Sequence, residues 1–182
     1  MRSILKRREL VADEWRYLDE VRADIADVTE AKQLAAGWVD ALIVPFVKFR
    51  AEPASWSAHD GRLGIRLTPV DPVEELAEHL PRLSLVAVEF PGPGDGRGFS
   101  QGQLLRSRLH FMGELRAVGA GVKQDLLFLM ARCGFDAFEL APGQRLDEAL
   151  AALERYSVAY QPGTRAPGDA LPAIRRQRFF AA

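Results

Sequence analysis

A regular alternation of short apolar runs with amphipathic stretches constrains the fold of this chain more than any other feature. Each run is closed by a proline or a glycine, which is typical of buried strands. The five runs predicted as strands are Val39–Val44, Leu63–Thr68, Leu85–Phe90, Glu114–Val118 and Asp136–Leu140. They begin roughly 25 residues apart, the length of a strand followed by a helix, so consecutive strands are expected to be parallel with right-handed crossovers.

The stretches between these runs have the apolar spacing and the end signals of helices. The predicted helices are Val73–Leu80, a stretch that begins near Ser100, Leu126–Met130 and Leu146–Leu153. Asp71 is a good N-cap for the first helix, and Pro72 suits its first position. Ser100 followed by Gln103 has the spacing of a capping box. Gly134 follows the third helix and suits a C-terminal cap.

These elements predict an α/β fold with an open, mostly parallel five-stranded sheet and helices on both faces, since near-continuous apolar strands need cover on both sides. Five units are too few for a closed eight-stranded barrel. A partial (β/α) barrel has the same order of elements and is the alternative. Near the N-terminus, Ile4-Leu5 and Glu9–Val11 flank Lys6–Arg8, which predicts a small β-hairpin that covers a sheet edge.

The length of 182 residues suits one domain with small appendages. Residues 1–159 are predicted to form a single α/β domain, with residues 1–38 as the N-terminal hairpin appendage. The sequence from Tyr160 onward is rich in proline and glycine. Residues 160–182 are therefore predicted to form an extended C-terminal tail.

The composition excludes several classes of site and partner. A single cysteine, Cys133, permits no disulfide within the chain and no cysteine-ligated metal or iron–sulfur cluster. The three histidines lack metal spacing, so no metal site is expected. The 24 basic residues nearly balance the 25 acidic ones, which argues against nucleic-acid and membrane-surface binding. No run approaches the roughly 18 apolar residues of a spanning helix, and no secretory signal is present, so we expect a cytoplasmic protein.

The loop after the third predicted strand is the most unusual segment, because glycines alternate through it up to the start of a predicted helix. Exposed N–H groups and the helix dipole favour an anion there. The anion-binding candidates are Asp95, Gly96, Arg97, Gly98, Ser100, Arg116 and Lys123, with Glu89 and Asp125 in support. The loop matches neither the phosphate-binding nor the dinucleotide-binding glycine motif. The alternative interpretation is a long turn in which Asp95 and Arg97 pair with each other.

Two charged residues, Glu89 and Arg116, interrupt otherwise apolar strands. Buried charges need partners, so an ion pair between them across neighbouring strands is expected. Cys133 lies at the predicted C-terminus of a helix, where the dipole raises the pKa of a thiol. We therefore expect it to be a packed side chain rather than a nucleophile. No G-x-S-x-G elbow is present, and no catalytic residue is assigned.

Five segments together carry a family resemblance. They are Val88–Pro91, Asp95–Ser100, Leu104–Arg106, Gly113–Gly119 and Cys133–Phe138. The chain resembles an uncharacterised bacterial family of unknown function, whose members are often encoded beside sulfite-reductase and sulfate-assimilation genes. Some members are labelled probable oxidoreductases. The chain departs from the family pattern at Pro91–Gly94 and at Gln124-Asp125.

The resemblance implies an accessory role in assimilatory sulfite or sulfate reduction, with sulfite reductase or another sulfur-assimilation protein as partner and a small anion as ligand. One cysteine cannot ligate a four-cysteine cluster, so the chain is not expected to be the reductase itself. The alternative is a small α/β enzyme or oxidoreductase that acts on an anionic or phosphorylated metabolite, and no cofactor is assigned. Phe111, Phe179 and Phe180 are candidate contact residues for a partner, and a homo-oligomer is also considered.

Overall fold

The computed structural model describes residues 2–21, 40–155 and 163–164. The predicted C-terminal tail lies outside the described residues, apart from Gly163 and Thr164. Within the described ranges, no helix reaches the length and apolarity that crossing a bilayer requires.

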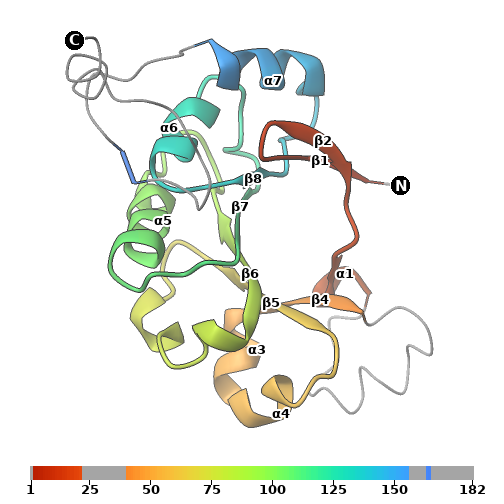
Figure 1. Ribbon diagram of the computed structural model, residues 1–182, viewed down its shortest axis with the longest axis vertical. Helices are drawn as coiled ribbons and strands as arrows, with labels where there is room; N and C mark the ends of the chain where they lie inside the picture. The colour runs from red at the N-terminus through yellow and green to blue at the C-terminus, as the bar shows by residue number, and fades with distance from the viewer. Residues whose placement is uncertain (1, 22–39, 156–162, 165–182) are drawn as a thin grey trace, which may run out of the picture.

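A single eight-stranded sheet forms the centre of the molecule (Figure 1). Its strands are β1 (Ser3–Lys6), β2 (Glu9–Ala12), β3 (Arg16–Tyr17), β4 (Ala41–Pro45), β5 (Arg62–Leu67), β6 (Leu83–Glu89), β7 (Glu114–Val118) and β8 (Ala137–Phe138). Their order across the sheet is β2-β1-β8-β7-β6-β5-β4-β3. Strands β3 to β8 are parallel, whereas β1 pairs antiparallel with both β8 and β2.

The five predicted strands correspond to β4–β8, but the prediction of a five-stranded open sheet is wrong. Strand β3 extends one edge, and the hairpin β1–β2 extends the other. The sheet curls into a half-barrel that opens on the side of the N-terminus (Figure 1). The alternative prediction, a partial barrel, is therefore confirmed.

Helices cover the convex side of this half-barrel (Figure 1). They are α3 (Phe46–Ala51), α4 (Pro53–Ser57), α5 (Arg97–Ser107), α6 (Leu127–Arg132) and α7 (Leu146–Glu154). Outward-facing strand residues such as Val44, Ile65 and Val86 pack against helix residues such as Phe49 and Leu105 in the main core. Full burial of an aliphatic or aromatic side chain of this size stabilises a fold by about 1.5–3 kcal/mol.

The prediction of helices on both faces is wrong, because the chain's own N-terminal region fills the concave face. A short crossing segment, Asp13–Trp15, leads from β2 at one edge of the sheet to β3 at the other. Trp15 and Tyr17 pack on the concave face in a second core that includes Ile43 and Leu85. Gly64 in β5 makes room for Trp15, since a Cβ there would lie 3.1 Å from the Trp15 ring and 3.0 Å from Leu85.

The N-terminal hairpin is present as predicted, and β1 covers the edge of β8. Its turn consists of Arg7 and Arg8, which have φ values of 48° and 67°. Positive φ at both central residues is the type I′ conformation, which matches the twist of a two-residue hairpin. Neither residue is the glycine or asparagine that usually occupies such positions, so this turn holds some backbone strain.

Two predicted helices differ from the structure. The stretch Val73–Leu80 is not an α-helix: a 3-10 helix, η1, covers Val73–Leu76, and a second, η2, covers Leu80–Arg82. Helix α5 begins at Arg97, so Ser100 lies inside its first turns and does not cap it. Pro81 lies inside η2, near its start. A short α1 covers Leu18–Val21 after β3.

Candidate functional site

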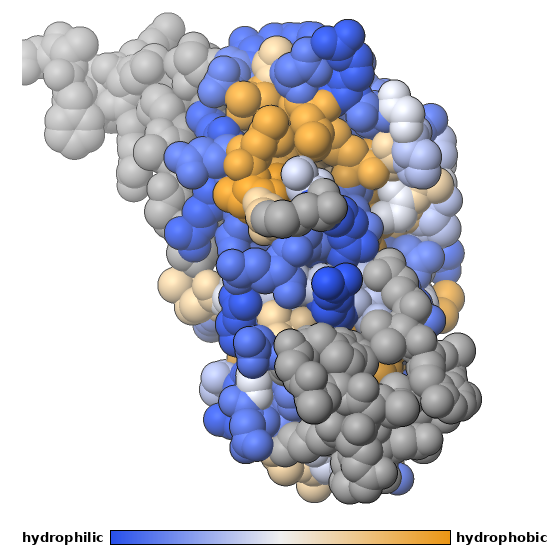
Figure 2. Space-filling model, turned by 90° about the vertical axis from the view of Figure 1, so that its right-hand side faces the viewer, coloured by the Kyte–Doolittle hydropathy of each residue, from blue (hydrophilic) through white to orange (hydrophobic). Residues whose placement is uncertain are grey.

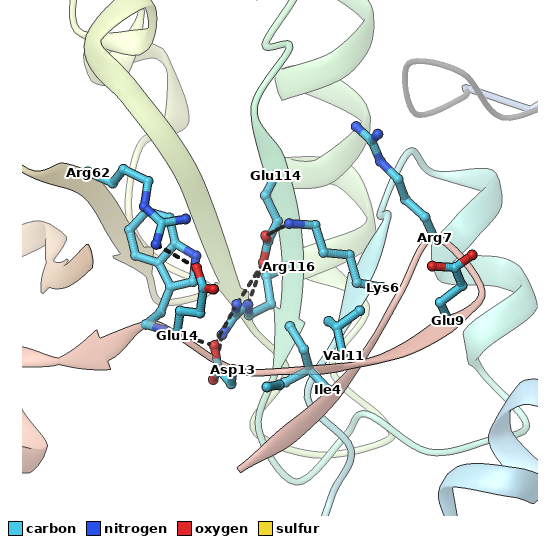
Figure 3. A pocket seen from close by; sticks show the side chains of 12 residues that line it. Ile4, Lys6, Arg7, Glu9, Val11, Asp13, Glu14, Arg62, Glu114 and Arg116 are labelled. Carbon is cyan, nitrogen blue, oxygen red and sulfur yellow. Dashed lines mark hydrogen bonds and ion pairs between the residues drawn. The ribbon is translucent and has the colours of Figure 1, made fainter. Parts of the chain in front are cut away.

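The most prominent collection of charged side chains lies on the concave face, where the crossing segment passes over strands β7 and β6. A pocket of about 290 Å³ opens there. It is lined by Ile4, Lys6, Arg7, Glu9, Val11, Ala12, Asp13, Glu14, Trp15, Arg62, Glu114 and Arg116 (Figure 3). Only Arg116 of these was among the candidate residues predicted from the sequence.

Arg116 is the centre of this site. The alternation of β7 directs Glu114 and Arg116 to the concave face and Leu115 into the main core. The Arg116 side chain is 0% exposed. Its two terminal nitrogens donate hydrogen bonds to the two carboxylate oxygens of Asp13, each at 3.0 Å. Its Nε donates to Glu114 Oε1 at 2.8 Å, so the guanidinium lies between two carboxylates (Figure 3).

Two further cations complete a charge-balanced cluster. Arg2 lies 2.7 Å from Asp13 and 3.2 Å from Glu139, and the Lys6 Nζ lies 2.6 Å from Glu114. The Tyr17 hydroxyl donates to Glu139 Oε2 at 3.0 Å. We call the six charged residues the Arg116 cluster; they are Arg2, Lys6 and Arg116 with Asp13, Glu114 and Glu139. Within this cluster three positive charges meet three negative ones.

The surroundings favour the charged forms of Asp13 and Arg116 and the neutral form of Tyr17. Burial opposes ionisation of Asp13, but the charge and hydrogen bonds of Arg116, followed by the charge of Arg2, lower its pKa below the ordinary value. Burial likewise opposes the charge on Arg116, but Glu114 and Asp13 raise its pKa above the ordinary value. Burial raises the pKa of Tyr17, and the negative charge of Glu139 raises it further. All three pKa values are shifted away from neutral pH, whereas an acid–base catalyst needs a pKa near neutral pH.

At the pocket mouth three further charged residues, Arg62, Glu14 and Arg7, are also paired. Arg62 lies 2.7 Å from Glu14 and stacks on the Trp15 ring at 5.3 Å from its centroid. Arg7 lies 4.0 Å from Asp136. The arrangement thus resembles a buried structural ion-pair network more closely than a set of poised reacting groups.

The predicted Glu89–Arg116 ion pair is wrong, although the expectation that Arg116 needs partners is correct. The register of β6 and β7 sets Ala87 opposite Arg116 and Val118 opposite Glu89. Within the residues that the structure describes, the ion pairs of Arg116 go to Asp13, Glu114 and Glu139.

The glycine-rich loop that was predicted to bind an anion follows the C-terminal end of β6, away from the Arg116 cluster. There Asp95 Oδ1 accepts hydrogen bonds from the backbone N–H of Arg97 at 3.1 Å and from its Nε at 3.0 Å. The second carboxylate oxygen lies 2.6 Å from a terminal nitrogen of Arg97. The hydrogen bonds to Arg97 lower the pKa of Asp95, and those to Asp95 raise the pKa of Arg97. This is the self-paired turn that the sequence left open as the alternative.

The other loop candidates have mixed surroundings. Gly98 is buried, and a Cβ there would lie 2.7 Å from the Phe90 ring, which explains why glycine stands at this position. Gly96 and Ser100 are exposed. Anion binding by this loop stays a prediction.

Lys123 and Asp125 lie in the loop after β7, which contacts the glycine loop through the backbone. The N–H of Gly121 donates to the Phe90 carbonyl at 2.8 Å, and a Cβ on Gly121 would lie 2.8 Å from the Gly92 carbonyl. The structure therefore brings the two predicted loops together. Arg116 is not part of this group, since its contacts lie on the concave face.

A second buried arginine explains several residues of the family pattern. The Arg106 guanidinium donates to the carbonyls of Phe111, Gly113 and Gly134, and it lies 3.4 Å from Asp136. Asp136 in turn accepts the Leu115 N–H at 2.8 Å. Burial raises the pKa of Asp136. These residues tie α5, β7 and the start of β8 together, which is a structural role.

Cys133 lies at the end of α6, and Gly134 follows with φ of 99°, as a C-terminal cap requires. Cys133 is half-buried, and burial raises the pKa of its thiol. This agrees with a packed side chain rather than a nucleophile. Phe111 is buried at 3% exposure, so its predicted role as a partner contact is wrong. Phe179 and Phe180 lie outside the described residues.

Sequence reasoning missed the N-terminal contributors to the site. Asp13, Glu14, Trp15 and Tyr17 were not among the candidates, although the stretch Asp13-Glu-Trp-Arg-Tyr17 carries a usable signal. Its aromatic residues alternate at a period of two, as in a strand with one buried face.

The comparisons with known proteins identify the family but no activity. The search of curated proteins returned no match. A family model described as "Bacterial protein of unknown function (DUF934)" matches residues 64–170, which is more than half of the chain. The matched region contains both buried arginines, Arg106 and Arg116. The chain therefore belongs to this bacterial family of unknown function.

Proposed function

We propose that the protein is a non-catalytic accessory protein of assimilatory sulfite or sulfate reduction, and that it acts through contact with another protein of that process. One observation carries the non-catalytic part of the proposal. In the Arg116 cluster every charge has an opposite charge within ion-pair distance, so the most elaborate polar site in the described residues is neutralised by the protein's own side chains.

The link to sulfur assimilation is supported by the family resemblance and not by the geometry. The single cysteine is consistent with a helper of sulfite reduction, because a chain with one thiol cannot supply the four thiolates of an iron–sulfur cluster. A reductase partner would then carry the electron-transfer chemistry, and this chain would affect its assembly or its activity.

Affinity purification from a sulfate-grown culture tests the contact. The tagged protein is expected to retain sulfite reductase or another sulfur-assimilation protein. Arg116→Met removes the centre of the Arg116 cluster and should lower recovery because it destabilises the fold, whereas the exposed substitution Arg145→Ala is the control that should leave recovery unchanged. Recovery of no sulfur-assimilation protein by a folded wild-type protein would contradict the proposal.

A small anion ligand is a second proposal, favoured by the exposure of Arg97. Its side chain is 58% exposed and stands at the start of the 11-residue helix α5. Binding would raise the melting temperature of the wild-type protein in sulfite, sulfate or phosphate, as RT ln(1 + [L]/Kd) requires. Arg97→Ala should abolish the shift.

The chain offers a matched control for that test. Arg145 and Asp147 have the same spacing and the same two-point contact at the start of α7, also on the surface. Arg145→Ala should leave the anion-dependent shift intact. Equal shifts in the wild-type protein and Arg97→Ala would remove the proposed site.

A further inference from the structure

Within the described residues, the N-terminal hairpin ends the sheet in an edge that no further strand covers. Strand β2 pairs only with β1 among the described strands. The pair Lys6–Glu9 closes the two-residue turn, so the N–H and C=O groups of Glu9 and Val11 are directed to β1. The corresponding groups of Leu10 and Ala12 are then directed away from the sheet.

This edge is also apolar. Leu10 is 50% exposed, the side chain of Val11 is partly exposed, and Ala12 is exposed. Figure 2 shows a hydrophobic patch on this side of the molecule, at the height where Figure 1 places the hairpin. Proteins usually protect a free edge with proline, a bulge, inward charges or a very short strand. The opposite edge is protected by a very short strand, since β3 has two residues, whereas β2 has four residues, with no proline and one charged side chain, Glu9.

The charge pattern around β2 is complementary to itself. A basic group, Lys6–Arg8, precedes Leu10, and an acidic pair, Asp13 and Glu14, follows it. In an antiparallel pair centred on Leu10, the basic turn of each copy would lie beside the acidic pair of the other. The side chains of Arg7 and Glu14 are 64% and 69% exposed, and in the pairing each would contact the opposite charge of the other copy in exchange for its present partner, Asp136 or Arg62. An unrelated strand would meet this arrangement only by coincidence.

We propose that two copies of this protein associate through antiparallel pairing of their β2 strands, with Leu10 facing Leu10 of the second copy at the two-fold axis. The pairing satisfies the outward groups of Leu10 and Ala12 and buries both Leu10 side chains on the convex side, the side to which Leu5 points. It joins the two half-barrels into one continuous sheet.

Sedimentation velocity over a concentration series tests this interface with the full chain. The wild-type protein should shift from monomer to dimer with increasing concentration. Leu10→Lys places two like charges opposite each other at the axis, and it should give a monomer whose melting temperature equals that of the wild type at concentrations where the wild type is monomeric. Val47→Lys is the matched control, because Val47 is 70% exposed on α3 and should tolerate lysine with the dimer intact.

Charge reversal tests the orientation of the strands. Arg7→Glu and Glu14→Lys should each raise the dimer Kd by about tenfold, since the two-fold axis doubles the loss of an exposed pair. The double variant should restore the wild-type Kd. A second measurement is oxidation of Leu10→Cys in a Cys133→Ser background. Cα atoms of a hydrogen-bonded antiparallel pair lie about 5.5 Å apart, within disulfide range, so a cross-linked dimer is expected.

Two results would overturn the inference. One is a wild-type protein that is monomeric at every concentration and whose Leu10→Cys variant does not cross-link. The other is a dimer that persists unchanged in Leu10→Lys, because the interface would then lie elsewhere.

Discussion

Removing Arg116 should destabilise the whole fold, because this side chain ties the crossing segment to the centre of the sheet. The side chains of Arg116 and Asp13 are both 0% exposed. Breaking a buried pair by removal of one partner costs about 3–5 kcal/mol. In Arg116→Met, Asp13 and Glu114 keep Arg2 and Lys6 as partly exposed counterions. The cost should therefore fall near the lower end, about 3 kcal/mol.

Urea denaturation of a double-mutant cycle measures the contact itself. Asp13→Ala should also destabilise the fold, since it leaves Arg116 buried with less compensation. The double variant should lose about 2 kcal/mol less than the sum of the single losses, which is within the range for residues in direct contact. A fold of this size has a total stability of about 5–15 kcal/mol, so all three variants should remain measurable.

The exposed pair Asp95–Arg97 provides the control for this cycle. It has the same two-point geometry, but Arg97 is mostly in solvent. Exposed pairs contribute little to stability, so Arg97→Met should leave the urea midpoint within experimental error. Strictly additive losses for Asp13 and Arg116, or single variants as stable as the wild type, would refute the reasoning.

Three further predictions concern individual side chains. The pKa of Asp13 is lowered in the fold, so the contribution of its carboxylate to stability is complete above the ordinary pKa of about 3.9 and is lost as the pH falls toward the pKa of the folded state. When the free energy of unfolding is measured from about pH 5 to pH 2, Asp13→Asn should therefore weaken the loss of stability at low pH. Gly98→Ala should cost about 1–3 kcal/mol by urea denaturation, because its Cβ would overlap the Phe90 ring, whereas Gly92→Ala has open space and should be near neutral. Tyr17→Phe removes a hydrogen bond to a carboxylate and should lower stability by about 1.5–3 kcal/mol in the same assay, and a neutral result would show that water replaces the hydroxyl.

The parallel strands could be predicted because their apolar character is local. Each of the five runs lies between proline or glycine residues, and each forms a strand of the structure. The hairpin was predictable for the same reason. Strand β3 was not, since it has two residues and owes its place to pairing with β4 and to the packing of Tyr17.

The partners of Arg116 could not be predicted, because they depend on how the sheet curls. Asp13 lies 103 positions away in the sequence and reaches Arg116 only because the crossing segment passes over the concave face. The position of Arg116 within an apolar strand correctly indicated that it needs a charged partner, but it did not indicate which residue that partner is. Glu89, the nearest acid on the adjacent strand by sequence reasoning, lies two residues beyond the register position.

The glycine loop is the reverse case, because its interacting residues were predicted but their role was not. The sequence correctly marked Asp95 and Arg97 as interacting residues, but it could not distinguish an anion site from a turn that satisfies itself. The structure shows the self-paired turn, with three contacts between these two residues. Whether an external anion competes with Asp95 depends on relative affinities, which the thermal-shift comparison with Arg145→Ala measures.

Growth of a deletion strain on sulfate, with cysteine as the comparison sulfur source, tests the central claim most directly. The account predicts slow growth on sulfate, normal growth on cysteine, and rescue by the wild-type gene. Arg116→Met, which destabilises the fold, should rescue less well than the wild type, whereas Arg145→Ala should rescue fully. Equal growth of the deletion strain and its parent on sulfate would contradict a role in sulfite or sulfate reduction.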